Sequence, residues 1–164
     1  MSRHFSRETS AGHRPKKRFG QNFLQDPHVL MQILHAIAPA LEDHLVEIGP
    51  GEGVMTADLL TQCRQLDIVE LDRDLVSHLE KRFADQTHLT IHSADALLFD
   101  WVALSKAPAS LRIIGNLPYN ISTPLLFKLF ASLPAIKDMH FLLQKEVVQR
   151  LCAPVGSKLY GRLS

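Results

Sequence analysis

Short apolar runs alternate with segments of helical periodicity along most of the 164-residue chain. The apolar runs predict five strands, at His44–Ile48, Leu66–Leu71, Leu89–His92, Leu111–Gly115 and Met139–Leu143. The segments of helical spacing predict helices at Val54–Thr61, Arg73–Phe83, Pro124–Ser132 and Lys145–Leu151. Because strands joined by helical connections of this length pair in parallel, we expect an α/β fold with a doubly wound, Rossmann-like sheet.

Proline residues mark two of the predicted helix starts. Asp26 and Pro27 are of the types preferred at the N-cap and at the first helical position, and apolar residues then recur at helical spacing up to Pro39. Thr123 and Pro124 form a similar pair. They predict that the helix before the fifth strand begins at Pro124.

Composition along the chain predicts three parts. Residues 1–18 are polar and basic without periodicity, which predicts a flexible arm. Residues 19–152 contain all the predicted strands and helices and form the expected domain. Residues 153–164 show no clear periodicity, so we expect a loop. The fifth strand leaves one edge of the sheet without a closing element, which is an unusual end for a doubly wound domain.

Composition excludes several classes of protein. With 46% hydrophobic and 21% charged residues, the chain is neither disordered nor fibrous. It has no apolar run of about 18 to 20 residues, as a membrane helix needs, and no signal-peptide core. Cys63 and Cys152 lie far apart without a neighbouring His/Cys cluster, so we expect neither a disulfide nor a metal site. We expect a cytoplasmic, monomeric protein.

The formal net charge of +1 conceals a division along the chain. Residues 1–20 carry a net charge of +5, residues 21–100 a net charge of −10, and residues 101–164 a net charge of +6. A polyanion is repelled by the middle segment and attracted by both ends, so nucleic-acid contact is expected at the arm and the last third. Charge alone favours the simpler interpretation, a solvated surface with a basic tail.

The first predicted strand ends in a glycine-rich turn, Gly49-Pro50-Gly51-Glu52-Gly53. Ligands of doubly wound sheets bind at such strand ends, and glycines allow a tight turn and close approach of a ligand. Val54 stands where a dinucleotide fingerprint has its last glycine, which argues against NAD. Glu47 and Glu52 suit a positively charged ligand better than a pyrophosphate. The alternative is a purely structural turn.

Acidic residues follow at the next two strand ends. Glu70 can accept hydrogen bonds from both hydroxyls of a ribose, and the alternative is a surface acid beside Asp72 and Asp74. Asp95 can accept a hydrogen bond from an adenine amino group, although an Asp after a strand is more often a helix cap. Together with the glycine turn, these acids describe a pocket for an adenosine-bearing cofactor without phosphates. S-adenosylmethionine fits that description.

The fourth predicted strand ends in Asn116-Leu117-Pro118-Tyr119, the most specific signal in the chain. An exocyclic base amine attacks a methyl donor only when its lone pair is drawn out of the ring. The Asn116 side-chain oxygen and the carbonyl of Leu117 or Pro118 can accept its two N–H groups, in a turn fixed by the proline. Tyr119 offers a flat face for an unstacked base. The alternative is a turn in which Asn116 only caps the next helix.

At these residues the chain resembles the ribosomal RNA adenine N6-dimethyltransferases of the bacterial small-subunit type. The matching segments are KKRFGQNFL (Lys16–Leu24), EIGPGEG, VELD, SADAL, NLPYNIST (Asn116–Thr123) and GSKLYGRLS (Gly156–Ser164). The resemblance implies a class I S-adenosylmethionine-dependent methyltransferase fold that continues into further strands and a small helical domain, so we expect this chain to be truncated before them. It implies cofactor contacts at Asn22, Leu24, Gly49, Gly51, Glu70, Asp95 and Asn116, and catalytic roles for Asn116, Leu117, Pro118 and Tyr119.

The resemblance also implies a reaction. Methyl groups of S-adenosylmethionine are expected to pass to N6 of two adjacent adenosines in small-subunit (16S) rRNA, within a 30S or pre-30S particle, during ribosome biogenesis. Macrolide-resistance methylases of large-subunit RNA share the pocket, whereas Asn120–Thr123 and Gly156–Ser164 favour the small-subunit type. A pre-ribosome binding factor with secondary catalysis and an NAD-dependent dehydrogenase stay open as alternatives.

Overall fold

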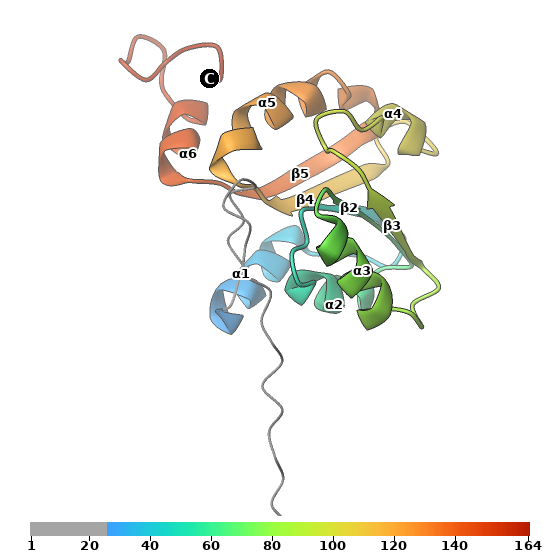
Figure 1. The fold of residues 1–164 in the computed structure, drawn as a ribbon. Coiled ribbons are helices and arrows are strands. Elements are labelled where there is room, and N and C mark those ends of the chain that lie inside the picture. Colours follow the sequence, from blue (N-terminus) through green and yellow to red (C-terminus); the bar gives the residue numbers. More distant parts are fainter. Residues whose placement is uncertain (1–25) are drawn as a thin grey trace, which may run out of the picture.

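A parallel sheet of five strands forms the centre of the computed structural model, which describes residues 26–164 (Figure 1). The strands are β1 (His44–Ile48), β2 (Gln65–Glu70), β3 (Leu89–Ser93), β4 (Leu111–Asn116) and β5 (Ile136–Leu142). They lie in the order β3-β2-β1-β4-β5, and each neighbouring pair is parallel. The strand order therefore reverses at β1, the place where open α/β sheets bind ligands. This confirms the expected doubly wound sheet.

Helices cover both faces of the sheet, with α1, α2 and α3 on one side and α4 and α5 on the other (Figure 1). Their bounds are α1 (Pro27–Ile37), α2 (Val54–Leu60), α3 (Arg73–Arg82), α4 (Trp101–Leu104), α5 (Tyr119–Phe130) and α6 (Lys145–Leu151). Neighbouring residues of β1 point to opposite layers, because side chains alternate along a strand. Leu45 packs into the α1–α3 layer and Val46 into the α4–α5 layer.

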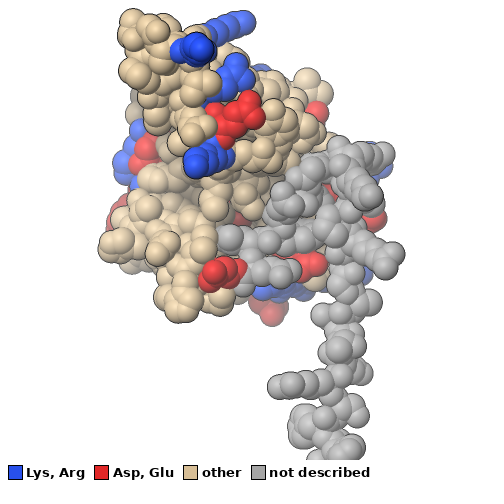
Figure 2. Space-filling model, turned by 90° about the vertical axis from the view of Figure 1, so that its left-hand side faces the viewer, with Lys and Arg blue, Asp and Glu red and all other residues tan. Residues whose placement is uncertain are grey.

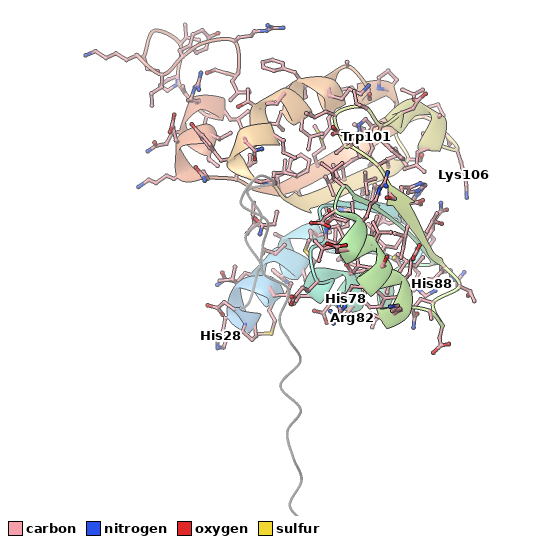
Figure 3. All side chains as sticks on the ribbon, in the orientation of Figure 1. His28, His78, Arg82, His88, Trp101 and Lys106 are labelled. Atoms are coloured by element: carbon pink, nitrogen blue, oxygen red, sulfur yellow. The ribbon has the colours of Figure 1, made fainter. Side chains whose placement is uncertain are left out.

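Two short elements were not predicted from the sequence, α4 and a 3-10 turn at Leu133–Ala135. Asp100 caps α4 by accepting a hydrogen bond from the Ala103 amide at 3.0 Å. Trp101, the single tryptophan of the chain, lies at the start of α4 and is fully buried (Figure 3). Its burial anchors the long connection from β3 to β4 against the sheet, and it is part of the core on the α5 side.

The predicted start of α5 at Pro124, with Thr123 as its cap, is wrong. The helix begins five residues earlier, at Tyr119, and Pro124 lies inside it. An interior proline leaves a carbonyl one turn earlier without its helical donor, here that of Asn120. Asn120 is exposed, so water can reach that carbonyl, and the Ser122 hydroxyl donates to the Tyr119 carbonyl at 3.1 Å. The first turn of α5 thus tolerates the proline.

A buried arginine joins the sheet ends that lie opposite the ligand-binding edge. Arg112 of β4 donates to Asp43 at 2.5 Å, to Asp138 of β5 at 3.0 Å and to the Ile37 carbonyl at 2.7 Å. Burial opposes ionisation of Asp43, but the hydrogen bonds from Arg112, the Ala40 amide and Lys137 together outweigh burial and lower the pKa of that carboxyl. This cluster fixes α1 and β5 to the centre of the sheet.

Beyond α6 the chain runs in turns, and its end returns to the molecule. Leu163 is buried against Leu126 of α5 and Val147 of α6. The predicted domain boundaries at residues 18 and 152 stay predictions, and the N-terminal arm, residues 1–18, lies outside the described residues.

Candidate functional site

The glycine turn that follows β1 combines an open side with a packed side. Gly49, Gly51 and Gly53 all have positive φ angles, of 64°, 62° and 79°, which only glycine adopts without strain. A Cβ at Gly49 would meet no atom within 4 Å, whereas a Cβ at Gly53 would come within 2.8 Å of Leu79 and 2.7 Å of Phe83. Gly53 is therefore required by packing against α3. Gly49 leaves backbone open to a ligand.

Hydrogen bonds hold this turn on both sides. The Gly49 amide donates to the Val69 carbonyl at 2.9 Å, which continues the pairing of β1 with β2 beyond Ile48. Arg82, on α3 (Figure 3), donates to the Glu52 carbonyl. Both contacts tie the turn to neighbouring elements, β2 and α3, so they hold its shape without a ligand.

Glu70, at the end of β2, is almost fully buried, with 3% of its surface exposed. The interpretation of Glu70 as a surface acid is therefore wrong. Its Oε1 accepts a hydrogen bond from the Asp72 amide at 2.8 Å, and within residues 26–164 its buried Oε2 has no partner. Burial raises the pKa of Glu70, while backbone N–H groups, that of Gly51 among them, act against the rise. A buried carboxylate oxygen beside the glycine turn is suited to accept hydrogen bonds from a ligand.

Asp95 lies just beyond β3 and holds its own turn. One of its oxygens accepts a hydrogen bond from the Leu97 amide at 2.9 Å, and the Ala94 amide donates to the Glu70 carbonyl at 3.0 Å. The side chain is half-exposed. The local bond matches the capping alternative, and the second carboxylate oxygen is compatible with a ligand contact.

The segment after β4 is shaped by its pairing with β5 and by the start of α5. Asn116 lies opposite Leu142, and the buried Leu117 donates from its amide to the Leu142 carbonyl at 3.1 Å. The Pro118 carbonyl accepts from the Ile121 and Ser122 amides, each at 3.2 Å. The Pro118 carbonyl is therefore engaged by the first turn of α5.

Strand register brings the predicted site residues to one edge of the sheet. Ile48, the last residue of β1, lies opposite Val69 of β2 and Gly115 of β4. Gly49, Glu70 and Asn116 each follow these three residues directly. Glu70 in turn lies opposite Ser93, two residues before Asp95. The four candidate segments therefore end level with one another, and Tyr119 is 55% exposed beside them.

One buried, hydrogen-bonded pair behind the glycine turn, Glu47 and Thr56, was not predicted from the sequence. Glu47 was expected to flank a ligand, but it is only 2% exposed and accepts a hydrogen bond from Thr56 of α2 at 2.6 Å. Burial raises its pKa to about 7, and the nearby Glu70 acts in the same direction. The signal in the sequence was the position of Glu47 inside the predicted strand HLVEI, and every residue of that strand is buried in the structure.

Some expectations fall outside the described residues. Asn22 and Leu24, the proposed cofactor contacts of the N-terminal segment, are among them. Within residues 26–164 no group of three or more His, Cys, Asp or Glu side chains could hold a metal ion. None of the helices described is long and apolar enough to cross a membrane.

Known proteins are similar to this chain in sequence and in fold. "Ribosomal RNA small subunit methyltransferase A" of Methylococcus capsulatus is 58% identical over 152 residues, which cover 93% of this chain and 59% of that protein. The chain thus spans less than two thirds of the length of such curated relatives. A dimethyladenosine transferase from Plasmodium falciparum, known from its crystal structure, is similar with a TM-score of 0.73 and 31% identity, over 87% of this chain and 50% of that one.

A second solved structure is similar in fold. The 23S rRNA methyltransferase ErmE has a TM-score of 0.64 and 24% identity, over 76% of this chain and 50% of that one. These neighbours confirm the class I methyltransferase fold. The family model described as ribosomal RNA adenine dimethylase matches residues 12–164. The chain therefore belongs to the ribosomal RNA adenine dimethylase family.

Proposed function

We propose that this chain carries the catalytic centre of an S-adenosylmethionine-dependent rRNA adenine N6-dimethyltransferase. Its substrate would be two adjacent adenosines of small-subunit rRNA in a 30S or pre-30S particle, modified during ribosome biogenesis in the cytoplasm. The relatives of more than 50% identity, named for small-subunit RNA, support this choice of RNA. One observation carries the proposal: an open glycine turn, a buried carboxylate and the Asn116–Tyr119 segment meet at one sheet edge.

The residues present fit the proposed cofactor. Open space beside Gly49 admits a ligand against the backbone, and the buried Oε2 of Glu70 is placed to accept hydrogen bonds from ribose hydroxyls. Asp95 keeps one oxygen available for an adenine amino group, as its half-exposed side chain allows. When bound, S-adenosylmethionine supplies an electrophilic methyl group on a sulfonium. Gly51, Asn116, Asn22 and Leu24 complete the proposed contacts.

The Asn116–Tyr119 segment would position the target amine. The Pro118 carbonyl already accepts hydrogen bonds from α5. The Leu117 carbonyl is therefore the better choice as the second acceptor for the amine, beside the Asn116 side-chain oxygen. These two oxygens would accept the two N–H groups and direct the nitrogen lone pair away from the ring. Pro118 fixes the turn, and the exposed ring of Tyr119 would stack on the flipped base. No general base with a shifted pKa is needed for this step.

A basic surface borders this segment and would contact RNA phosphates. Exposed bases gather on α6 and the chain end (Figure 2), and α6 also carries the exposed acid Glu146. The bases are Lys145, Arg150, Lys158 and Arg162. Helix α6 begins three residues after Leu142, the partner of Asn116, so the surface lies next to the proposed amine site. By contrast, Arg112 and Lys137 are paired with acids and do not contribute.

Two experiments test the function and its alternatives. Titration with S-adenosylmethionine and with NAD separates a methyltransferase from a dehydrogenase. Methyl transfer from labelled cofactor to purified 30S or 50S subunits then separates a small-subunit enzyme from a large-subunit methylase. Labelled dimethyladenosine in small-subunit RNA is expected. A variant without activity that still binds 30S particles and supports their maturation would favour a binding factor.

A further inference from the structure

Two buried carboxyl groups lie behind and beside the glycine turn, on the same face of the sheet. Glu47 of β1 lies opposite Ile68 of β2, and Glu70 follows Ile68 by two residues. Side chains two residues apart on one strand share a face and are separated by about 6.6 Å along that strand. Glu47 and Glu70 therefore lie on the same face of the sheet. Both groups are at most 3% exposed, so water screens their interaction weakly.

The surroundings of Glu47 favour its neutral form. Its two neighbours in register, Ile68 and Ile114, are fully buried and apolar. The hydrogen bond from the fully buried Thr56 is the contact that favours the ionised form. The pKa of Glu47 is therefore raised to about 7 by burial, with repulsion from Glu70 adding to the rise. Near neutral pH this carboxyl group changes its charge readily.

The buried titratable groups nearest the glycine turn are acids, whereas the cations of the elements packed around Glu47 are exposed or lie at the opposite end of the sheet. The charged and titratable groups of these elements are Glu70 and Asp72 at the β2–α3 junction, Asp58 on α2, the exposed Arg73, Asp74, His78, Glu80, Lys81 and Arg82 on α3, His28 and His35 on α1, and His44, Asp67 and Arg112 toward the opposite end of the sheet. Arg112 is itself held by Asp43 and Asp138. A positive charge arriving over the glycine turn would thus lie near two buried acids, Glu47 and Glu70, while the exposed Arg82 is held on the Glu52 carbonyl of the turn.

We propose that Glu47 is a specificity-determining residue, which releases its proton when a cationic ligand lies over the glycine turn and keeps it when the ligand there is neutral. The inference rests on the proposed function, because a methyl donor with a sulfonium is cationic at the position where its product, a thioether, is neutral. Ionised Glu47 and Glu70 then bind the donor more tightly than the product. The proton passes to solvent on donor binding and returns once the sulfonium charge is gone, which favours product release.

Linkage gives the size of the expected effect. A ligand that favours ionised Glu47 gains affinity with rising pH, by at most about tenfold per pH unit, and the gain levels off as pH rises past the pKa of about 7 and Glu47 becomes ionised without the ligand. S-adenosylhomocysteine has the same ribose, adenine and amino-acid groups but no sulfonium. Protonation changes caused by the groups that both ligands share cancel in the comparison, so the difference between the ligands isolates the response to the sulfonium.

The test is calorimetric titration of the chain with both ligands, between pH 6 and 8, in buffers of different ionisation enthalpy. At pH 7 we expect S-adenosylmethionine to release about half a proton more than S-adenosylhomocysteine, since Glu47 is then about half protonated. In Glu47→Gln this difference should vanish. In the control Asp58→Asn, an acid on α2 outside the turn, it should persist.

A second pair of variants keeps the test valid if Glu47→Gln does not fold. Thr56→Val removes the donor that stabilises the ionised form, so the pH dependence of the affinity ratio should move to higher pH. Thr56→Ser keeps the hydroxyl and should leave the pH dependence of the affinity ratio unchanged. Equal proton release by the two ligands in the unmodified chain would overturn this inference and leave the proposed function standing. Absence of binding by both ligands would overturn the proposed function and this inference with it.

Discussion

The Leu117 amide donates a hydrogen bond of 3.1 Å to the Leu142 carbonyl, which extends the pairing of β4 with β5 one residue beyond Asn116. This bond points the Leu117 backbone toward β5, while the Pro118 carbonyl is engaged by α5. The segment proposed to hold the target amine is therefore fixed by sheet and helix together. Rigid placement of two acceptors is what the proposed reaction needs.

The first prediction concerns Asn116. Replacing it by Ala removes one of the two acceptors for the amine, and this acceptor acts mainly as the amine turns pyramidal. Turnover should therefore fall by about 100-fold or more, while RNA affinity changes little. Single-turnover kinetics and RNA binding by the same preparation measure both. If turnover survives and only RNA affinity falls, the role given to this segment is wrong.

A second prediction concerns Glu70. Glu70→Gln keeps the shape of a buried side chain but weakens the hydrogen bonds proposed for the ribose, each worth roughly 1.5 to 3 kcal/mol. Cofactor affinity should fall by about 100-fold, and the melting temperature should change much less. Glu80→Gln, on the exposed side of α3, is the matched control. Unchanged affinity would leave Glu70 with a structural role alone.

The two ends of the glycine turn should respond differently to alanine. Both Gly49→Ala and Gly53→Ala place a side chain at positive φ, at a cost of about 1 to 2 kcal/mol. Gly53→Ala must also displace Leu79 and Phe83, so it should lower stability more. Gly49→Ala meets open space and should instead reduce cofactor binding. Urea unfolding and cofactor titration of both variants check the contrast, and the reverse order would contradict it.

Stability should depend on pH through Glu47. Its pKa is about 7 in the folded chain against 4.5 as the ordinary value. For a carboxyl group with a raised pKa, the neutral form contributes stability that is complete below pH 4.5 and is lost as pH rises through about 7. The unmodified chain should thus lose stability relative to Glu47→Gln over this range. Urea unfolding at a series of pH values tests this without any ligand, and parallel curves would contradict it.

Acid should act in the opposite direction through Asp43 and Asp67. Asp67 accepts hydrogen bonds of 2.6 Å from both His44 and His92. Burial acts to raise the pKa of Asp67, but these hydrogen bonds together outweigh burial and lower it. The pKa of Asp43 is lowered as well. Such carboxylates contribute stability above their ordinary value of 3.8 that is lost as pH falls below it. Asp67→Asn should therefore flatten the acid limb of the stability curve, as urea unfolding between pH 2 and 5 would measure.

Much of this structure could be predicted from the sequence, and the failures have physical causes. The bounds of β1 and α6 match the prediction residue for residue, because apolar spacing and turn residues mark them clearly. The start of α5 was missed because Thr123-Pro124 has the local signature of a helix start, whereas exposure of Asn120 lets the helix absorb the proline. Local sequence does not show whether the carbonyl that a proline leaves without a helical donor is accessible to water.

The candidate site was predicted in position but not in environment. The residues at strand ends follow from topology, so Gly49, Glu70 and Asn116 could be grouped from the order of the predicted strands. The burial of Glu47 and Glu70 depends on how α2 and α3 pack over β1 and β2, which residue type does not reveal. The engagement of the Pro118 carbonyl likewise follows only from the true start of α5.

The most direct test of the central proposal is to incubate the chain with labelled S-adenosylmethionine and 30S particles that lack adenine dimethylation, and to map the labelled base. The account predicts label as dimethyladenosine at two adjacent positions of the small-subunit RNA, abolished in Asn116→Ala. Label confined to large-subunit RNA when both subunits are offered, or no RNA label from a chain that binds the cofactor, would contradict it.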